Sequence, residues 1–253
     1  MKLLRRLAAL LLVSLLLVPL ALLAGSVGPA DVASALADER ALRALGVSLR
    51  TALASLLLIL VLGTPLALWL SRATGRTARV VEACVDLPVL LPPAVAGVAL
   101  LSAFGARGPW VALFGSDASL AFTSAAVILA QVFVGSPFYV RSATEAFRTV
   151  DAESLLVARS LGAGPWRAFR EVGLPATAPA LAAGATLSLA RALGEFGATL
   201  IFAGSLMGRT QTLPLAIYAA LEDDLGLAVA LSLLLTLTAL ALLACVRLLV
   251  RSA

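Results

Sequence analysis

The sequence contains no histidine and a single lysine, Lys2, near its N-terminus. Without histidine, the chain lacks the commonest general base and metal ligand of proteins. A phosphate-binding loop of the type G-x-x-x-x-G-K-[ST] requires a lysine after a glycine-rich turn, so this chain cannot form one. We therefore expect no catalytic residues, no metal site and no cofactor in this chain, and any nucleotide chemistry would have to be carried out by another polypeptide.

Charged residues are also scarce. They make up 13% of the 253 residues, whereas hydrophobic residues make up 61%, and the mean hydropathy is +1.05. Soluble domains average about 25% charged and roughly 45–50% apolar residues, so the composition excludes an ordinary soluble protein. Cys84 and Cys245 have no metal-binding spacing, and we interpret both as small apolar residues. The composition predicts an all-α integral membrane protein with a single domain, residues 1–253.

Apolar segments long enough to cross a bilayer, about 17–25 residues, occur six times. The predicted spans are Leu7–Ala24, Thr51–Ser71, Leu87–Ala106, Ala118–Val140, Ala178–Phe202 and Leu225–Val246. The first could also be a cleaved signal peptide, but its uncharged run is longer than the usual apolar region of about 7–15 residues, which favours an uncleaved helix. The third begins with three prolines, which predicts a broken or re-entrant start.

The segments between these spans are predicted mainly as loops: Gly25–Arg50, Arg72–Asp86 and Gly105–Asp117. Thr212–Leu221 is predicted as a short helix at the membrane interface. Cytoplasmic loops of membrane proteins are enriched in Lys and Arg. An N-terminus inside the cell places thirteen of the nineteen basic residues in inner segments and five in outer ones. The basic character therefore indicates topology, with both termini in the cytoplasm, and does not indicate nucleic-acid binding.

One inner segment, from Val150 to Pro179, is unusually polar. Asp151 is a suitable helix N-cap and Gly162 a suitable stop, so a short helix is expected between them. Pro165 suits the first turn of a second short helix, which is predicted to end at Gly173. The apolar residues Leu155, Ala158 and Leu161, with Trp166 and Phe169, follow helical spacing. Such a surface fits the groove of a partner protein, or alternatively packs on lipid headgroups.

This segment resembles the cytoplasmic "EAA" loop of ABC importer permeases. Gly162, Val172, Leu174 and Pro175 occupy the positions of the glycine, the aliphatic residue and the Leu-Pro pair of that motif. The three E-A-A positions hold Leu156, Val157 and Ala158, so the acidic residue of the family is missing. Glu153, three residues earlier, is a candidate to supply that charge.

The resemblance extends to L-P-P-A-V-A-G at Leu91–Gly97, A-L-G-E-F-G-A-T-L at Ala192–Leu200 and G-R-T-Q-T-L-P-L-A-I-Y at Gly208–Tyr218. These motifs are similar to the molybdate/sulfate branch of such permeases, and to molybdate permeases most of all. The resemblance implies a type I ABC importer permease fold in the bacterial inner membrane and a homodimer. It also implies a cytoplasmic ABC ATPase dimer, which holds ATP and Mg²⁺, and a periplasmic or lipid-anchored oxyanion-binding protein.

On this interpretation the inner loop, residues 141–175, couples the permease to the ATPase. The coupling residues would be Glu153, Leu155, Leu156, Ala158, Leu161, Gly162, Trp166, Phe169, Leu174 and Pro175. Residues of the broken third span, the small-residue fifth span and an outer loop are candidates for the pathway or its gates. They are Pro92, Pro93, Gly97, Thr186, Ser188, Arg191, Glu195, Thr199, Arg209, Thr210 and Gln211.

Arg191 and Glu195 are four residues apart and can pair along one helix face. We favour a structural pair, because an unpaired Glu195 would repel an anionic substrate; the alternative is that Arg191 meets the anion during transport. Two other kinds of protein fit the sequence less well. An ion-coupled secondary transporter usually shows midplane carboxylates and repeated halves, and an intramembrane enzyme would need acid–base residues that are missing here. Molybdate, tungstate and sulfate share shape and charge and are not separated by the sequence.

Overall fold

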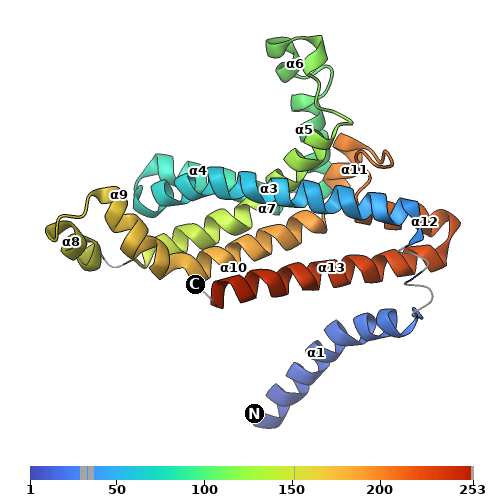
Figure 1. Cartoon of the computed structure of the whole chain (residues 1–253), viewed down its shortest axis with the longest axis horizontal. Coiled ribbons are helices and arrows are strands. Elements are labelled where there is room, and N and C mark those ends of the chain that lie inside the picture. The colour runs from blue at the N-terminus through green and yellow to red at the C-terminus, as the bar shows by residue number, and fades with distance from the viewer. Residues whose placement is uncertain (29–32, 34–36, 151, 252–253) are drawn as a thin grey trace.

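The structure is a computed structural model that describes residues 1–28, 33, 37–150 and 152–251. Four long helices run side by side as a bundle (Figure 1), namely α3 (Glu39–Arg72), α7 (Ser124–Arg148), α10 (Leu174–Leu193) and α13 (Leu225–Arg251). Helix α1 (Lys2–Gly25) diverges from this bundle and touches it at α13. Within the described residues, six segments are long and apolar enough to cross a membrane, which confirms the predicted number.

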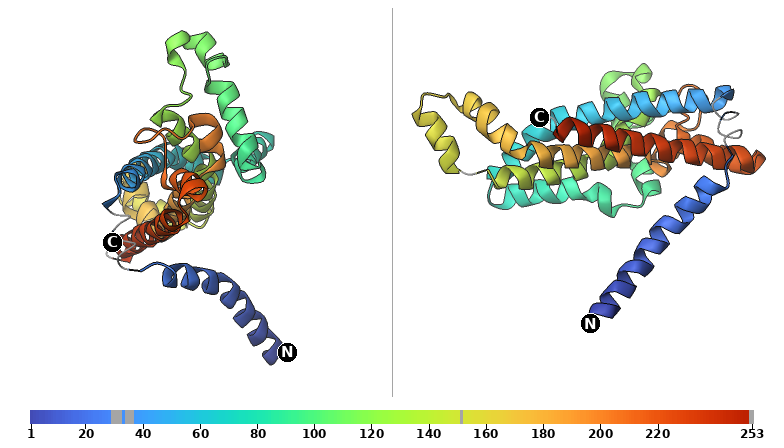
Figure 2. Two further views of the ribbon diagram at one scale, coloured as in Figure 1. Left: turned by 90° about the vertical axis from the view of Figure 1, so that its right-hand side faces the viewer. Right: turned by 60° about the horizontal axis from the view of Figure 1, so that its bottom comes forward.

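The remaining helices are short and lie at the ends or on the side of the bundle. Helices α8 (Ala152–Ser160) and α9 (Pro165–Ala168) extend from one end, and α12 (Leu213–Asp223) lies at the other (Figure 1). Helices α5 (Pro93–Phe104) and α6 (Pro109–Phe114) stand across the bundle direction, as Figure 1 and the left view of Figure 2 show. The other short elements are α4 (Arg76–Leu90), the turn η1 (Ser116–Ala118), the π turn η2 (Phe169–Gly173) and helix α11 (Gly197–Ala203).

Two segments that were predicted as loops are helical instead. Helix α3 begins at Glu39, inside the predicted loop Gly25–Arg50, because Asp38 caps it by accepting a hydrogen bond from the backbone N–H of Arg40 at 2.6 Å. Helix α4 (Arg76–Leu90) occupies most of the predicted loop Arg72–Asp86. Between its charged residues, Ala78, Val81 and Val85 follow helical spacing and form an apolar stripe. Ala78 is buried, and the two valines pack against the core cluster that contains Tyr139 and Val140 of α7.

The predicted boundaries of the other spans also shift. The proline-rich break is confirmed: α4 ends at Leu90, Leu91 and Pro92 are extended, and α5 begins at Pro93. The predicted loop Gly105–Asp117 contains α6 and most of η1. The fourth span starts at Ser124, later than the predicted Ala118, because Thr123 caps it, and it extends past the predicted Val140 to Arg148. The fifth, predicted as one helix over Ala178–Phe202, is divided into α10 and α11.

Small residues bring α7 and α10 into close contact. A Cβ atom added to Gly184 would lie 2.7 Å from the Cβ of Ser142. About one turn further along α10, the Ser188 hydroxyl donates to the carbonyl of Gly135 at 2.7 Å. Close approach of this kind is typical of helix packing in membranes, where burial of apolar surface supplies no driving force between helices. Helices α7 and α10 therefore form the tight centre on which the other elements are placed.

Candidate functional site

The polar segment that follows α7 forms a helix, a glycine turn and a second helix, as the sequence predicted. At the end of α8 the N–H of Gly162 donates to the carbonyl of Arg159 at 3.0 Å, and the N–H of Ala163 donates to that of Ala158 at 3.1 Å. This is the Schellman arrangement, in which the glycine at the turn takes a positive φ; the φ of Gly162 is 90°. The prediction of Asp151 as the N-cap falls outside the described residues.

The second helix does not end at Gly173, so that prediction is wrong. Helix α9 continues through a π-helical turn, η2 (Phe169–Gly173), directly into α10. The N–H of Leu174 donates to the carbonyl of Phe169, five residues back. Pro175 lies in the first turn of α10 and lacks an N–H, so the α-helical hydrogen-bond ladder cannot pass through it, and the wider π turn bridges the gap. The helix–turn–helix is therefore continuous with the membrane-spanning helix α10.

In the predicted coupling segment, residues 152–175, the four most exposed of the described large apolar side chains face away from the rest of the molecule. Leu156, Val157, Leu161 and Trp166 are 58%, 55%, 83% and 71% exposed. Phe169 turns the other way and lies against Phe147 of α7, with ring centroids 5.8 Å apart. The predicted stripe is thus divided: Leu161 and Trp166 are exposed, and Phe169 holds the segment on the bundle. The predictions for the side chains of Glu153 and Leu155 fall outside what the structure describes.

The predicted pair between Arg191 and Glu195 forms at the break between α10 and α11. The Arg191 guanidinium lies 2.7 Å from one oxygen of Glu195, and the other oxygen accepts from the N–H of Ala198 at 2.8 Å. Glu195 is 1% exposed. Because both carboxylate oxygens have partners, the charge is compensated inside the apolar bundle, as buried ionisable groups require. The geometry agrees with the structural role favoured from the sequence.

The proline-rich start of α5 crosses α11 at two glycines. A Cβ atom at Gly97 would lie 2.8 Å from the Cβ of Ile201 and 3.0 Å from the Cα of Ala198. A Cβ at Gly197 would lie 2.8 Å from the Cβ of Pro93. The structure thus brings together two predicted pathway regions that are about a hundred residues apart in the sequence, the third-span break and the Glu195 region.

The predicted pathway hydroxyls have different surroundings. Ser188 donates to Gly135, as described above, and Thr186 donates to the carbonyl of Ala182 at 2.8 Å while lining a cavity of about 360 Å³ between α10 and α13. Thr199 is fully buried, and its hydroxyl has no hydrogen-bond partner among the described residues. In this conformation Thr186 and Ser188 donate to backbone carbonyls, whereas the O–H group of Thr199 remains free to donate to another group.

The predicted outer loop around residues 208–212 is an ordered turn. The carbonyl of Leu206 accepts from the N–H groups of Arg209, Thr210 and Gln211. The buried Thr210 hydroxyl accepts from the N–H of Leu206 at 2.9 Å, and the Gln211 amide donates to Ser205 at 3.2 Å. Arg209 is exposed. The turn therefore presents a cation on a rigid backbone.

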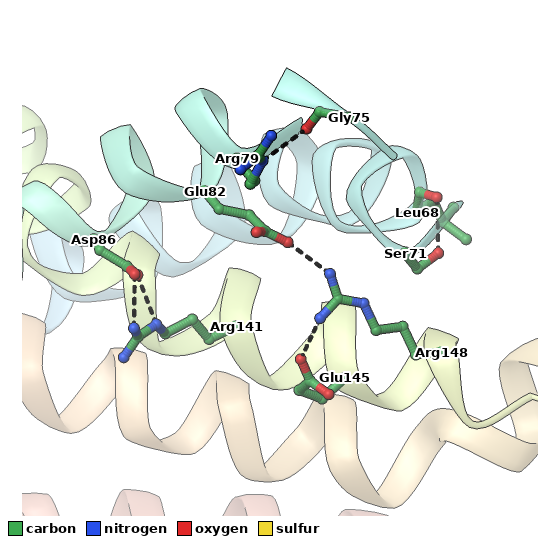
Figure 3. A network of polar contacts seen from close by, with 9 residues as sticks. All are labelled: Leu68, Ser71, Gly75, Arg79, Glu82, Asp86, Arg141, Glu145 and Arg148. Carbon is green, nitrogen blue, oxygen red and sulfur yellow. Dashed lines mark hydrogen bonds and ion pairs between the residues drawn. The ribbon is translucent and has the colours of Figure 1, made fainter. Parts of the chain in front are cut away.

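Two polar contacts within the bundle were not anticipated from the sequence. Ser55 of α3 and the buried Gln131 of α7 are joined at 2.8 Å. A second group, shown in Figure 3, joins α4 to α7: Asp86 pairs with Arg141, and Arg148 pairs with both Glu82 and Glu145. The single amide in the fourth apolar run was a signal for the first contact. The pairs of Asp86 with Arg141 and of Glu82 with Arg148 had no local signal, because their partners belong to different helices.

Comparison with known proteins identifies the family. The model of the binding-protein-dependent transport system inner membrane component matches residues 59–253. The chain belongs to this family. The molybdenum transport system permease protein ModB of Mycobacterium tuberculosis is 48% identical over 201 residues, which span 78% of this chain and 75% of the relative. ModB of Escherichia coli (strain K12) is 34% identical over 186 residues, spanning 71% and 79%. The resemblance seen in the sequence is confirmed.

Solved structures show the same fold. A bacterial ABC transporter involved in the import of the acidic polysaccharide alginate superimposes with a TM-score of 0.76 at 16% identity, covering 97% of this chain and 95% of that one. The MetNI methionine ABC transporter, in an inward-facing conformation, gives a TM-score of 0.63 at 21% identity, covering 83% and 94%. The chain is an all-α ABC transporter permease with the type I importer fold, as predicted.

Proposed function

We propose that this chain is the membrane-spanning subunit of an ATP-driven importer of a tetrahedral oxyanion, molybdate. Relatives that match at 48% and 34% identity carry the name of molybdenum transport permeases. The observation that carries the coupling part of the proposal is the exposed helix–turn–helix of α8 and α9, which continues directly into α10. Its exposed Leu161 and Trp166 fit the groove of a cytoplasmic ATPase.

The partners follow from this role. The permease acts as a homodimer in the bacterial inner membrane, with both termini in the cytoplasm, and receives the anion from a periplasmic or lipid-anchored binding protein. ATP and Mg²⁺ are held by the ATPase dimer, and this chain needs no cofactor of its own. Residues 141–175 form the coupling loop within a single permease domain. The missing acidic residue at Leu156 implies that docking depends more on shape and apolar contact than on an ion pair.

The pathway is proposed to run past the α10–α11 break. Neutral donors and positive charge suit a dianion, and the free hydroxyl of Thr199 and the exposed Arg209 offer one of each. Arg191 is occupied by Glu195 in this conformation. The crossing of α5 and α11 at Gly97 is a candidate gate, because movement of α5 there would change the packing around Glu195.

The test is uptake of radiolabelled molybdate into vesicles that contain the permease, its co-purified ATPase and the binding protein. Uptake is expected to require ATP inside the compartment that holds the ATPase. Tungstate and sulfate are expected to inhibit molybdate uptake according to their affinities for the binding protein. Uptake driven by a proton or sodium gradient without ATP would contradict the proposal in favour of a secondary transporter. Replacing Glu153 by Gln tests its assigned charge; unchanged coupling would remove Glu153 from the docking surface.

A further inference from the structure

Helices α4 and α7 are joined by two ion pairs that form a ladder along their contact (Figure 3). Asp86 and Arg141 make a two-point contact, with Nε to Oδ1 at 2.6 Å and Nη2 to Oδ2 at 2.7 Å. One helical turn earlier on α4, Glu82 lies 2.6 Å from Arg148. Glu82 and Asp86 are four residues apart and therefore share one face of α4. Two-point guanidinium–carboxylate contacts fix geometry as well as charge.

Arg148 has a special position in this ladder. It is the last residue of α7, and it also pairs with Glu145 at 2.6 Å. It lines a cavity of about 220 Å³ together with Phe169 and Gly173 of the coupling segment. Arg148 thus lies between α4 on one side and the coupling segment on the other.

The rest of the α4–α7 contact is apolar and borders a cavity. Val81 and Val85 touch the core cluster around Tyr139 and Val140, and α7 is the main neighbour of α4 in the described part of the chain. The ion pairs border a polar cavity of about 200 Å³. It is also lined by Thr144, whose buried hydroxyl has no partner in the described part of the chain. Apolar packing therefore holds α4 on α7, and the ion pairs add directional contacts that set the register of α4 along α7.

Helix α4 leads directly to the candidate gate. It ends at Leu90, and two extended residues later α5 begins and crosses α11 at Gly97. A shift of α4 along α7 would therefore pull on α5 across this short connection. The coupling segment contacts the end of α7 where Phe169 packs against Phe147. Arg148, the next residue of α7, pairs with Glu82 of α4, and α4 leads to α5.

We propose that Glu82, Asp86, Arg141 and Arg148 form an ionic tie that transmits movement of the coupling segment to α4 and, across the break at Leu91 and Pro92, to α5. The inference rests on the proposed function, since it assigns a route for the coupling. The four residues are positioning residues that contact neither the anion nor the nucleotide. Breaking the tie leaves ATP hydrolysis running while α4 no longer follows the loop.

The experiment measures molybdate uptake and ATP hydrolysis in the same vesicles, using the complete complex of permease, ATPase and binding protein. Arg148→Gln and Asp86→Asn are expected to lower the number of anions taken up per ATP by about five-fold, while hydrolysis per assembled complex persists. Arg148→Lys and the charge-reversed pair Asp86→Arg with Arg141→Asp are expected to keep this ratio within about two-fold of the unaltered complex, because charge complementarity is retained. Glu39→Gln, which breaks an exposed ion pair with Arg43 on α3, is the matched control.

Two results would overturn the inference. In the first, uptake and hydrolysis fall in proportion, so that the ratio is unchanged and the ion pairs only anchor α4. In the second, the charge-reversed pair assembles normally, as judged by co-purification of the ATPase, but stays as uncoupled as Arg148→Gln. If the neutral variants Arg148→Gln and Asp86→Asn fail to assemble, Arg148→Lys and the charge-reversed pair are compared with the unaltered complex instead, and uncoupling of a charge-reversed pair that assembles overturns the inference. Failure of the proposed function is seen separately, as a lack of ATP-driven uptake by the unaltered complex.

Discussion

The ion pair at the end of α10 and the ion pairs between α4 and α7 use the same chemistry in different surroundings. Glu195 is 1% exposed and Arg191 31% exposed, whereas Asp86 and Arg141 are 30% and 63% exposed and Arg148 is 41% exposed. A buried carboxylate that loses its partner leaves a costly uncompensated charge. An exposed one is solvated by water instead. Burial therefore makes the first pair a support of the α10–α11 break whose loss is costly, whereas the exposed ion pairs between α4 and α7 contribute little to stability.

The largest expected effect comes from breaking the buried pair. Arg191→Gln leaves Glu195 uncompensated and is expected to destabilise the permease by about 3–5 kcal/mol, which lowers the melting midpoint in detergent by roughly 10 °C. The double change Arg191→Gln with Glu195→Gln is expected to regain more than half of this loss. Arg43→Gln, which breaks an exposed pair on α3, is the control. A double variant as unstable as the single one would contradict the structural role.

Transport by the same variants separates the two roles of Arg191. If the double change restores both stability and molybdate uptake, Arg191 is not a substrate ligand. Restored stability with uptake still lost would instead place Arg191 on the anion's route, and would reverse the interpretation of the buried pair as structural.

The second expected effect concerns the close contact that supports the buried pair. Gly97→Ala would place a Cβ 3.0 Å from the Cα of Ala198, whose N–H donates to Glu195. Displacement of that backbone is expected to cost about 1–3 kcal/mol. Thermal melting checks it against Gly46→Ala, because a Cβ at Gly46 would meet the Arg50 guanidinium at an ordinary 3.5 Å. Equal melting midpoints for the two variants would show that the α5–α11 contact accommodates an added methyl group without loss of stability.

A smaller loss of stability is expected from the exposed pairs. Arg141→Gln should change the free energy of unfolding by less than about 1 kcal/mol, because solvent screens the pair with Asp86. The measurement is the melting midpoint beside that of Arg191→Gln. A loss as large as that of the buried pair would mean that α4 is held by charge alone, and would remove the distinction between the two regions.

The smallest expected effect is the response to salt. Exposed ion pairs are screened strongly at about 1 M ionic strength, where the Debye length is roughly 3 Å, and buried pairs much less. The midpoint difference between Arg141→Gln and the unaltered chain should therefore vanish at high salt, while that of Arg191→Gln persists. Salt-independent differences in both variants would indicate that Asp86 and Arg141 are shielded by the membrane or by a partner.

Much of the architecture could be predicted from local patterns. Six apolar runs, the Gly162 turn and the i,i+4 pair of Arg191 and Glu195 each depend on residues that are close in the sequence. Helix α4 was missed because its charges made Arg72–Asp86 resemble a solvated loop, although two of them, Glu82 and Asp86, pair with arginines of α7. The continuation of α9 into α10 was missed because Pro175 normally marks an end, and the π turn that accommodates it has no sequence signature of its own.

The sequence by itself determined the class of protein and the number of spans, and it excluded a G-x-x-x-x-G-K-[ST] loop in this chain, because composition, apolar length and a single lysine are properties of the chain alone. Only the tertiary structure decided which charges meet. Asp86 and Arg141 are 55 residues apart, and Glu82 and Arg148 are 66 apart. Such partners are selected by how helices pack in space. The same packing buried Glu195 and left Asp86 partly solvated, a difference that no pattern of neighbouring residues records.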